Sequence, residues 1–423
     1  MSGRVSEWDK YLLGSVLFVS LLIGGGTASG LFTDTLIEIM AIVTGAVVFS
    51  RTSSQGAPRF AVWLLFFAGA LLVLQVVPLP AAFFSHFRPE FLLGDPWLAG
   101  ETRFRFVSVG VGRTIECLLY LVASSAFFLS VMRLRIEQVY GLLPFFFMGV
   151  ICNGLAGAIQ YSLSNDIAIK GLLPFTINAG LFANQNHFSA LLFVSIPFVV
   201  YYGLFRGHLV SGALGLVTLL LLLLAAGSRA GVLIGLAITM ISVIFLSARS
   251  RISGLGILVL FVGLSIYTIG AWTKIDAKVI DPAFGRAEFA RTTIEGIKEN
   301  WVTGIGFGNF QKAYQVYEKE GMIFSAYVNH AHNDYLEIAF EGGIFAVVLM
   351  AIYFMLLLVS YAGIRREPLQ KAAFLSVSDP KRSWVISMTC DSIGVAKPRR
   401  SITCGLISPA PSMPERDYVI QAI

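Results

Sequence analysis

Residues 328–343 read VNHAHNDYLEIAFEGG, and an apolar run from Ile344 to Tyr361 follows directly. The stretch brings two histidines and three carboxylates to the start of a segment that approaches the roughly 20 apolar residues needed to cross a membrane. Ionisable groups at membrane depth are costly and are usually functional. We therefore predict that this stretch is the catalytic end of a large loop on the extracytoplasmic side, which the rest of the chain delivers to one face of a membrane.

The composition excludes an ordinary soluble protein. Of the 423 residues, 56 % are hydrophobic and 13 % are charged, and the mean hydropathy is +0.76. A soluble domain carries about 25 % charged residues. The chain is thus predicted to be an all-α polytopic membrane protein. Its net charge of +6 does not indicate a nucleic-acid partner, because much of that charge lies in short loops between apolar runs, where it sets membrane orientation.

Ten stretches are predicted to span the membrane. They are 11–28, 33–50, 60–78, 114–132, 138–161, 187–204, 209–226, 231–247, 253–271 and 335–361. Lysines and arginines accompany every second connection, so they share one side, which we predict to be the cytoplasm. The outer side then receives 79–113, 162–186, 227–230 and 272–334. The first of these connections breaks the charge rule with four arginines, Arg88, Arg103, Arg105 and Arg113.

The chain is predicted to consist of a membrane domain, residues 1–362, and a polar tail, residues 363–423. Ser, Pro, Lys and Arg become frequent in the tail, and no span follows. This composition predicts a disordered cytoplasmic segment.

The histidine pair offers a base for proton transfer. His332 titrates in the range suited to taking a proton from a hydroxyl at neutral pH. His330 reaches the same site only if the segment is extended there. As an alternative, the pair binds a metal ion together with Asp334 or Glu337.

The carboxylates that follow the histidines have a structural interpretation. With Asp334 as the N-cap, Glu337 falls at N3, which completes a capping box at the start of the tenth span. We favour this interpretation over catalysis. Glu341 suits the start of a helix electrostatically, and it could also orient a histidine.

Arg229 lies in the short outer connection GSRAG, residues 227–231, against the charge rule. One interpretation without a functional role is an arginine that faces lipid and extends its charged end to the head groups. We favour an anion site, because a guanidinium binds phosphate oxygens bidentately and a helix N-terminus assists.

Two further groups of polar residues are predicted on the outer side. Arg286 and Arg291 lie on a predicted amphipathic helix, 286–300, but five positions apart they do not share a face closely, and either could simply be solvated. Asn186 belongs to an amide-rich stretch, 178–187, which predicts a helix cap and turn, with binding of sugar hydroxyls as the alternative.

Taken together, these motifs resemble the O-antigen ligase family, a membrane superfamily that includes O-antigen polymerases and protein O-oligosaccharide ligases. The resemblance runs from about residue 60 to 360. It is carried by SRAG at 228–231, Arg286 before Trp301, GIGFGNF at 304–310, HNDYL at 332–336 with Glu341-Gly342, and FANQNHF at 182–188.

The resemblance implies a multi-pass protein of the bacterial inner membrane that acts at the periplasmic face without a metal ion or cofactor. It would move a glycan from an undecaprenyl diphosphate carrier to a hydroxyl of lipid A-core or of another glycan or protein. By the same resemblance, Arg229 and Arg286 would bind the diphosphate and His332 would be the base, with His330 in support. Asn333, Glu341, Asn186 and Arg291 are further candidate residues.

The chain departs from the family after the tenth span, where members usually have two more spans. A truncated or frame-shifted reading from about residue 367 is our hypothesis for this difference. The site residues do not separate a ligase from a polymerase or a protein glycosyltransferase. A transporter of lipid-linked sugars is a more distant alternative, because its charges would lie near the membrane midplane.

Overall fold

The computed structural model describes residues 7–26, 31–51, 59–84, 104–162, 178–247, 263, 267, 269–270, 282–319 and 328–363. Most of the ninth predicted span, 253–271, lies outside these residues. The polar tail also lies outside them from residue 364 onward.

Helices occupy the other nine predicted spans. Their bounds are α1 Glu7–Ile23, α2 Phe32–Arg51, α3 Arg59–Val76, α5 Val111–Val131, α6 Ile136–Tyr140 with α7 Leu143–Ser162, α8 Gln185–Phe205, α9 Leu209–Ala226, α10 Arg229–Ser247 and α14 Asp334–Gly363. A short pair of antiparallel strands, β1 Leu79–Pro80 and β2 Phe104–Arg105, flanks the four-residue helix α4, Ala81–Phe84. In the part of the chain that the structure describes, seven helices are long and apolar enough to cross a membrane. The prediction of an all-α polytopic membrane protein is confirmed.

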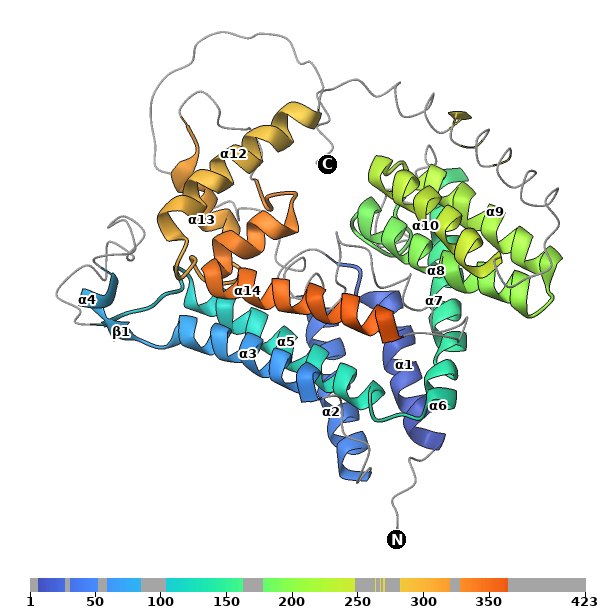
Figure 1. The fold of residues 1–423 in the computed structure, drawn as a ribbon, viewed down its shortest axis with the longest axis horizontal. Helices are drawn as coiled ribbons and strands as arrows, with labels where there is room; N and C mark the ends of the chain where they lie inside the picture. The colour runs from blue at the N-terminus through green and yellow to red at the C-terminus, as the bar shows by residue number, and fades with distance from the viewer. Residues whose placement is uncertain are drawn as a thin grey trace, which may run out of the picture.

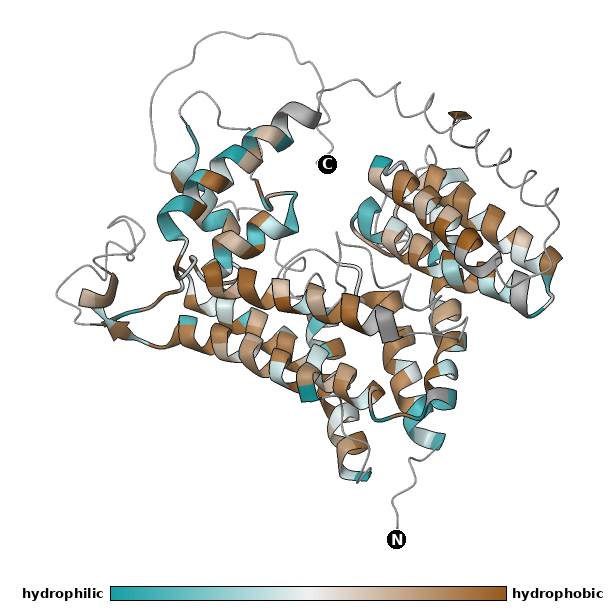
Figure 2. Cartoon of the chain, viewed as in Figure 1, coloured by the Kyte–Doolittle hydropathy of each residue, from teal (hydrophilic) through white to brown (hydrophobic). Residues whose placement is uncertain are grey.

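The helices pack into two groups joined by α1, α2 and α7 (Figure 1). In one group α8 contacts α9 and α10, and their core includes Leu191, Ile196 and Leu223, each fully buried. In the other group α3 packs against α5 and α14. Figure 2 shows apolar residues along these helices, whereas the helices above the start of α14 are more hydrophilic.

Arginines gather at one end of the bundle, which we call the basic end. Arg51 at the end of α2 lies 3.6 Å from Asp9, and Arg135 lies 3.5 Å from Glu7, both on α1. The guanidinium of Arg133 lies 3.9 Å above the ring of Phe49. The start of α1 and the ends of α2 and α5 therefore share one end, as the alternating charge pattern predicts.

The connections predicted on the outer side meet at the opposite end, which we call the site end. The N–H of Ala183, before α8, donates to Gly25 O, after α1 (2.7 Å). The N–H of Ser108, before α5, donates to Gln75 O on α3 (2.9 Å).

Helices α2 and α5 run in the same direction. Their direction shows whether the connections before α8 and after α1 lie at the same end as those before α5 and after α3. Asp34 near the start of α2 accepts a hydrogen bond from Tyr120 (3.4 Å), and Phe49 near its end lies against Arg133. The starts of α2 and α5 therefore belong to the same end, so both groups of connections lie at the site end.

The last helix, α14, is broken at Gly343, whose φ of 61° and ψ of −158° are not helical. A break leaves backbone groups without partners inside the helix, which is tolerated at membrane depth only where protein covers them. Here the loop after α12 (Pro282–Asn300) provides the partners. Ile305 N–H donates to Phe340 O, Gly306 N–H to Glu341 O, and Ile344 N–H to Trp301 O, at 2.8 to 3.1 Å.

Candidate functional site

The site end carries a small lobe built from α12, α13 (Phe310–Tyr317) and the first turns of α14 (Figure 1). Its core consists of Ile305, Phe310, Ala313, Tyr314, Val328, Ala331 and Phe340. Burial raises the pKa of the Tyr314 phenol, so this group stays neutral within the core. The amphipathic helix predicted at 286–300 is confirmed and begins four residues earlier. The helix α13 was not predicted.

The loop that joins α12 to α13 needs its glycines. Gly304, Gly306 and Gly308 have φ values of 66°, 93° and 80°, a region that L side chains rarely adopt. A Cβ on Gly304 would meet the carbonyl of Glu341, and one on Gly306 would meet Ser108. The loop thus lies directly between α14 and the segment that precedes α5.

Gln75, near the end of α3, joins these parts through one buried amide. Its Nε2 donates to Glu341 O (2.9 Å) and Thr303 O (3.4 Å), while its Oε1 accepts from Phe307 N–H (3.1 Å). The residue is 1 % exposed. Both the nitrogen and the oxygen of this amide therefore hold the loop and the broken helix against α3.

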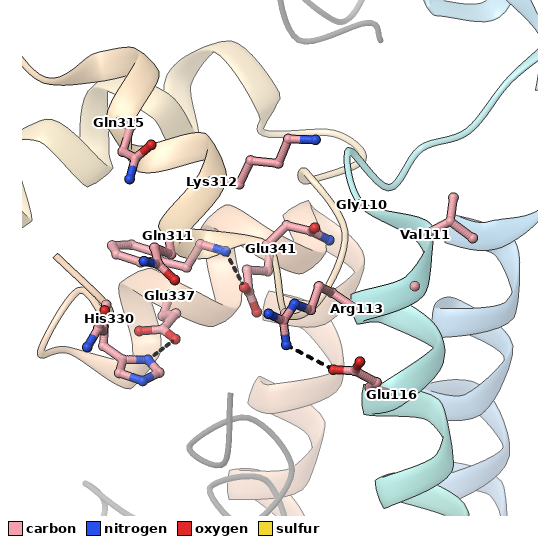
Figure 3. Close-up of a pocket in the computed structure, with 15 residues that line it drawn as sticks. Gly110, Val111, Arg113, Glu116, Gln311, Lys312, Gln315, His330, Glu337 and Glu341 are labelled. Carbon is pink, nitrogen blue, oxygen red and sulfur yellow. Dashed lines mark hydrogen bonds and ion pairs between the residues drawn. The ribbon is translucent and has the colours of Figure 1, made fainter. Parts of the chain in front are cut away.

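A polar cavity of about 690 Å³ opens between this lobe and the start of α5 (Figure 3). Its lining comes from three segments: the turn into α5, the loop and first residues of α13, and the start of α14. The lining residues are Gly110, Val111, Gly112, Arg113, Glu116, Gly308, Asn309, Phe310, Gln311, Lys312, Gln315, Asn329, His330, Glu337 and Glu341.

His330 and Glu337 face each other on one side of the cavity (Figure 3). His330 Nδ1 lies 2.8 Å from Glu337 Oε1, and Ala331 N–H donates to Glu337 Oε2 (3.0 Å). The predicted capping box is therefore wrong. Helix α14 begins at Asp334, and the side chain of Asn333 accepts from the N–H groups of Tyr335 and Leu336 instead.

Glu341 lies at the back of the cavity and is 2 % exposed. Its Oε1 accepts from Phe310 N–H (2.8 Å), the first residue of α13. Glu341 thus accepts a hydrogen bond at the start of α13, a helix that the sequence did not reveal, whereas its electrostatic role was predicted for the start of its own helix.

The opposite side of the cavity carries cations. Arg113 on α5 forms an ion pair with Glu116 (3.1 Å), and Lys312 on α13 donates to Val109 O (3.1 Å). Sequence reasoning did not place either residue in the site. Arg113 did carry a signal, because it is one of the arginines that break the charge rule, whereas Lys312 carried none.

His332 takes a different position from His330. Its φ is 52°, its side chain is exposed, and its ring stacks on Phe289 with the centroids 5.6 Å apart. It is not among the residues that line the cavity. The structure thus separates the two predicted histidines by their surroundings.

Arg229 and Asn186 lie together at the starts of α10 and α8. The Ser228 hydroxyl donates to Asn186 Oδ1 (2.6 Å) and accepts from Gly231 N–H (3.0 Å). The Asn184 side chain caps α8, as the cap prediction for this stretch requires. Arg229 is thereby fixed to the site end of the bundle, although it does not line the cavity.

Arg286 and Arg291 lie exposed on α12 and do not line the cavity. Arg291 forms an ion pair with Glu288 (3.0 Å). Among the described residues, no group of three or more His, Cys, Asp or Glu side chains is arranged to hold a metal ion.

The cavity lining combines a proton acceptor with positively and negatively charged side chains that donate or accept hydrogen bonds. Such a lining suits a hydroxyl-rich ligand, whose groups need partners of both kinds. A carboxylate bound to an imidazole is also a usual way to prepare a general base.

A comparison with family models matches residues 214–351 to the O-antigen ligase family. This segment begins in α9 and ends in α14, so it contains Arg229, the lobe and the histidine pair. The matched segment is shorter than the range, about residues 60–360, over which the motifs resemble the family. A comparison with curated proteins gives no match. Residues 214–351 are thus similar to the O-antigen ligase family, a family of glycosyltransferase-like membrane proteins.

Proposed function

We propose that the protein transfers a glycan from an undecaprenyl diphosphate carrier to an acceptor hydroxyl at the periplasmic face of the bacterial inner membrane. The carrier's diphosphate is bound by Arg229 and Arg286, and the histidine pair supplies the base. No metal ion or cofactor takes part.

The observation that carries this proposal is the His330–Glu337 pair inside a polar cavity at the site end, within the segment that matches the family. A cavity of about 690 Å³ lies in the range of small-ligand sites, roughly 300–1,000 Å³, and is large enough for a sugar unit. Its position at the helix ends suits a donor whose lipid stays in the membrane while its sugar extends outward.

The chemistry needs few groups. The base takes the acceptor's hydroxyl proton as the oxygen attacks the anomeric carbon. The bond from that carbon to the diphosphate oxygen breaks, and the diphosphate leaves with the electron pair. Guanidinium groups stabilise the charge that develops on the leaving group, because they bind phosphate oxygens bidentately.

Deletion of the gene in the source bacterium, followed by gel separation of its surface glycans, tests the function. Core without attached chains identifies a ligase, and a single repeat on the core identifies a polymerase. Intact lipopolysaccharide with a lost exopolysaccharide or glycoprotein identifies another acceptor within the same chemistry.

Surface glycans that remain unchanged in the deletion strain would contradict the proposal. Complementation with the wild-type gene serves as the control, since restored glycans show that the loss comes from this gene. A double variant, His330→Ala with His332→Ala, should fail to complement while still inserting in the membrane.

A further inference from the structure

Three amide side chains line the cavity: Gln311 and Gln315 on α13, and Asn329 in the segment before α14. Gln311 and Gln315 are one helical turn apart, so they share a face of the helix. Both are drawn in Figure 3, on the helix that borders the cavity. Two separate segments of the chain thus bring amides to the cavity that His330 also lines.

These amides have no partner within the described part of the protein. Asn329 Oδ1 is buried, and no hydrogen-bond donor among the described residues reaches it. Neither the Gln311 nor the Gln315 side chain forms a hydrogen bond with another described residue. A buried polar atom without a partner is uncommon in native proteins and needs an explanation. A ligand that donates a hydrogen bond to Asn329 supplies one.

The charged side chains of the lining, in contrast, already have partners within the protein. The contacts, at 2.8 to 3.1 Å, are Arg113–Glu116, His330–Glu337, Glu341–Phe310 N–H and Lys312–Val109 O. Apart from the histidine, the lining contains three carboxyl groups and two basic side chains. An anionic ligand would therefore meet no excess of positive charge, and the uncharged amides are the groups that remain for binding.

We infer that the cavity is a subsite for one uncharged sugar residue of a reacting glycan, and that Gln311, Gln315 and Asn329 determine its specificity. The inference rests on the proposed function. An amide donates through its nitrogen and accepts through its oxygen, which matches sugar hydroxyls, since each of these also donates and accepts. A uronic acid or a phosphorylated sugar would instead bring its negative charge close to the three carboxyl groups.

The position of the subsite suits a sugar close to the reacting bond. Asn329 directly precedes His330, so a sugar held by Asn329 lies beside the histidine pair. Arg229 and Arg286, proposed to bind the diphosphate, do not line the cavity. The cavity therefore accommodates a sugar without competing with the diphosphate for the same groups.

Binding of simple glycosides tests the subsite directly. The full-length protein in lipid nanodiscs is examined by saturation-transfer NMR with millimolar methyl glucoside, methyl N-acetylglucosaminide and methyl glucuronide. We expect the two uncharged glycosides to bind more tightly than the glucuronide. Asn329→Leu and Gln311→Leu should each weaken their binding about 3- to 10-fold, the effect of losing one neutral hydrogen bond.

Glu295→Leu is the matched control and should bind the glycosides as the wild type does. It places a leucine on the same lobe, at a residue that pairs with Lys319 and does not line the cavity. No binding of either uncharged glycoside to the wild type, equal binding by the Asn329→Leu/Gln311→Leu double variant, or tighter binding of the glucuronide would overturn the inference.

Thermal unfolding distinguishes a binding amide from a structural one. Asn329→Leu should leave the midpoint of the ligand-free protein unchanged or higher, because it removes a buried acceptor that has no partner to lose. A lower midpoint would assign Asn329 to the structure and remove it from the subsite. Gln311→Leu tests the subsite independently, since Gln311 is only half-buried on the surface of α13.

The bound sugar can come from the lipid-linked donor or from the acceptor, and transfer kinetics separate these sources. With both substrates extracted from the source bacterium, the double variant should raise KM about tenfold or more for the substrate whose sugar occupies the subsite. Unchanged KM for both substrates would overturn the inference and leave the proposed function intact. Unchanged surface glycans in the deletion strain would instead remove the proposed function, and glycoside binding would still be measurable.

Discussion

At the residue scale, Arg229 is fixed by its neighbours. Ser228 bonds to Asn186 on α8, and Gly231 packs so closely on α8 that an added Cβ would meet Ser189. The backbone around Arg229 is thus rigid, which lowers the entropic cost of presenting its guanidinium to an anion. The start of α10 adds a favourable helix dipole.

Arg229→Lys should therefore impair transfer although the charge is kept, since lysine cannot reproduce the guanidinium fork. Losing one charge-assisted hydrogen bond costs ~1.5–3 kcal/mol, which predicts a decrease in kcat/KM of about tenfold or more. Steady-state transfer assays with varied donor concentration measure this effect. Arg206→Lys, after α8 at the opposite helix end, is the control and should leave kcat/KM unchanged. Equal activity of Arg229→Lys and wild type would remove Arg229 from the diphosphate site.

The sequence located the chemically active residue types but not their partners. The spacing of Asp334 and Glu337 is compatible with a capping box, and only the structure shows that Glu337 contacts His330 in the irregular segment before α14. Arg113 and Lys312 reach the cavity from segments about 200 positions apart. Local patterns contain no information about such contacts.

At the scale of elements, the break in α14 and the loop after α12 form one unit with Gln75. Gln75→Ala would leave Phe307 N–H without this partner, whereas Glu341 O would keep its hydrogen bond from Gly306 N–H. Leaving one such group unsatisfied costs ~1–3 kcal/mol. We expect the free energy of unfolding to fall by ~1–3 kcal/mol, seen as a lower thermal midpoint of the purified protein in detergent.

An exposed glutamine provides the control for this prediction. Gln315→Ala on α13 should leave the midpoint within error of the wild type, because the side chain is exposed. A Gln75→Ala protein as stable as the control would show that α14 and the loop hold together without α3.

Hydropathy was sufficient to predict a helix at nine of the ten expected spans, with bounds within about five residues, because membrane helices need long apolar runs. The ninth span lies mostly outside the described residues, and seven of the described helices are long and apolar enough to cross a membrane. The break at Gly343 was not predicted, since the apolar pattern continues through it. The helix α13 was not predicted either. It is eight residues long, and its stability depends on Phe310, Ala313 and Tyr314, which pack into a core made from distant segments.

At the scale of the whole molecule, the basic end and the site end should lie on opposite sides of the membrane. Positive charges between spans favour the cytoplasm, which leaves the cavity on the outer side. Single cysteines introduced at Gln315 and Arg206, with the four native cysteines replaced, should react differently with a membrane-impermeant maleimide. Intact spheroplasts should be labelled at position 315 only, and lysed membranes at both positions. Labelling of both positions in intact cells would refute the arrangement.

The hydrogen bond from the Gln75 amide to the carbonyl of Glu341 joins residues that are 266 positions apart in the sequence. At a synthesis rate of about 5–20 residues per second, the glutamine leaves the ribosome roughly 10–50 s before its partner exists. During that interval the newly inserted third helix presents an unsatisfied amide to lipid or to the translocation machinery. Assembly of this end of the protein is therefore a late event in biogenesis, and slow translation of the second half should prolong the period in which quality-control proteases can recognise the nascent chain.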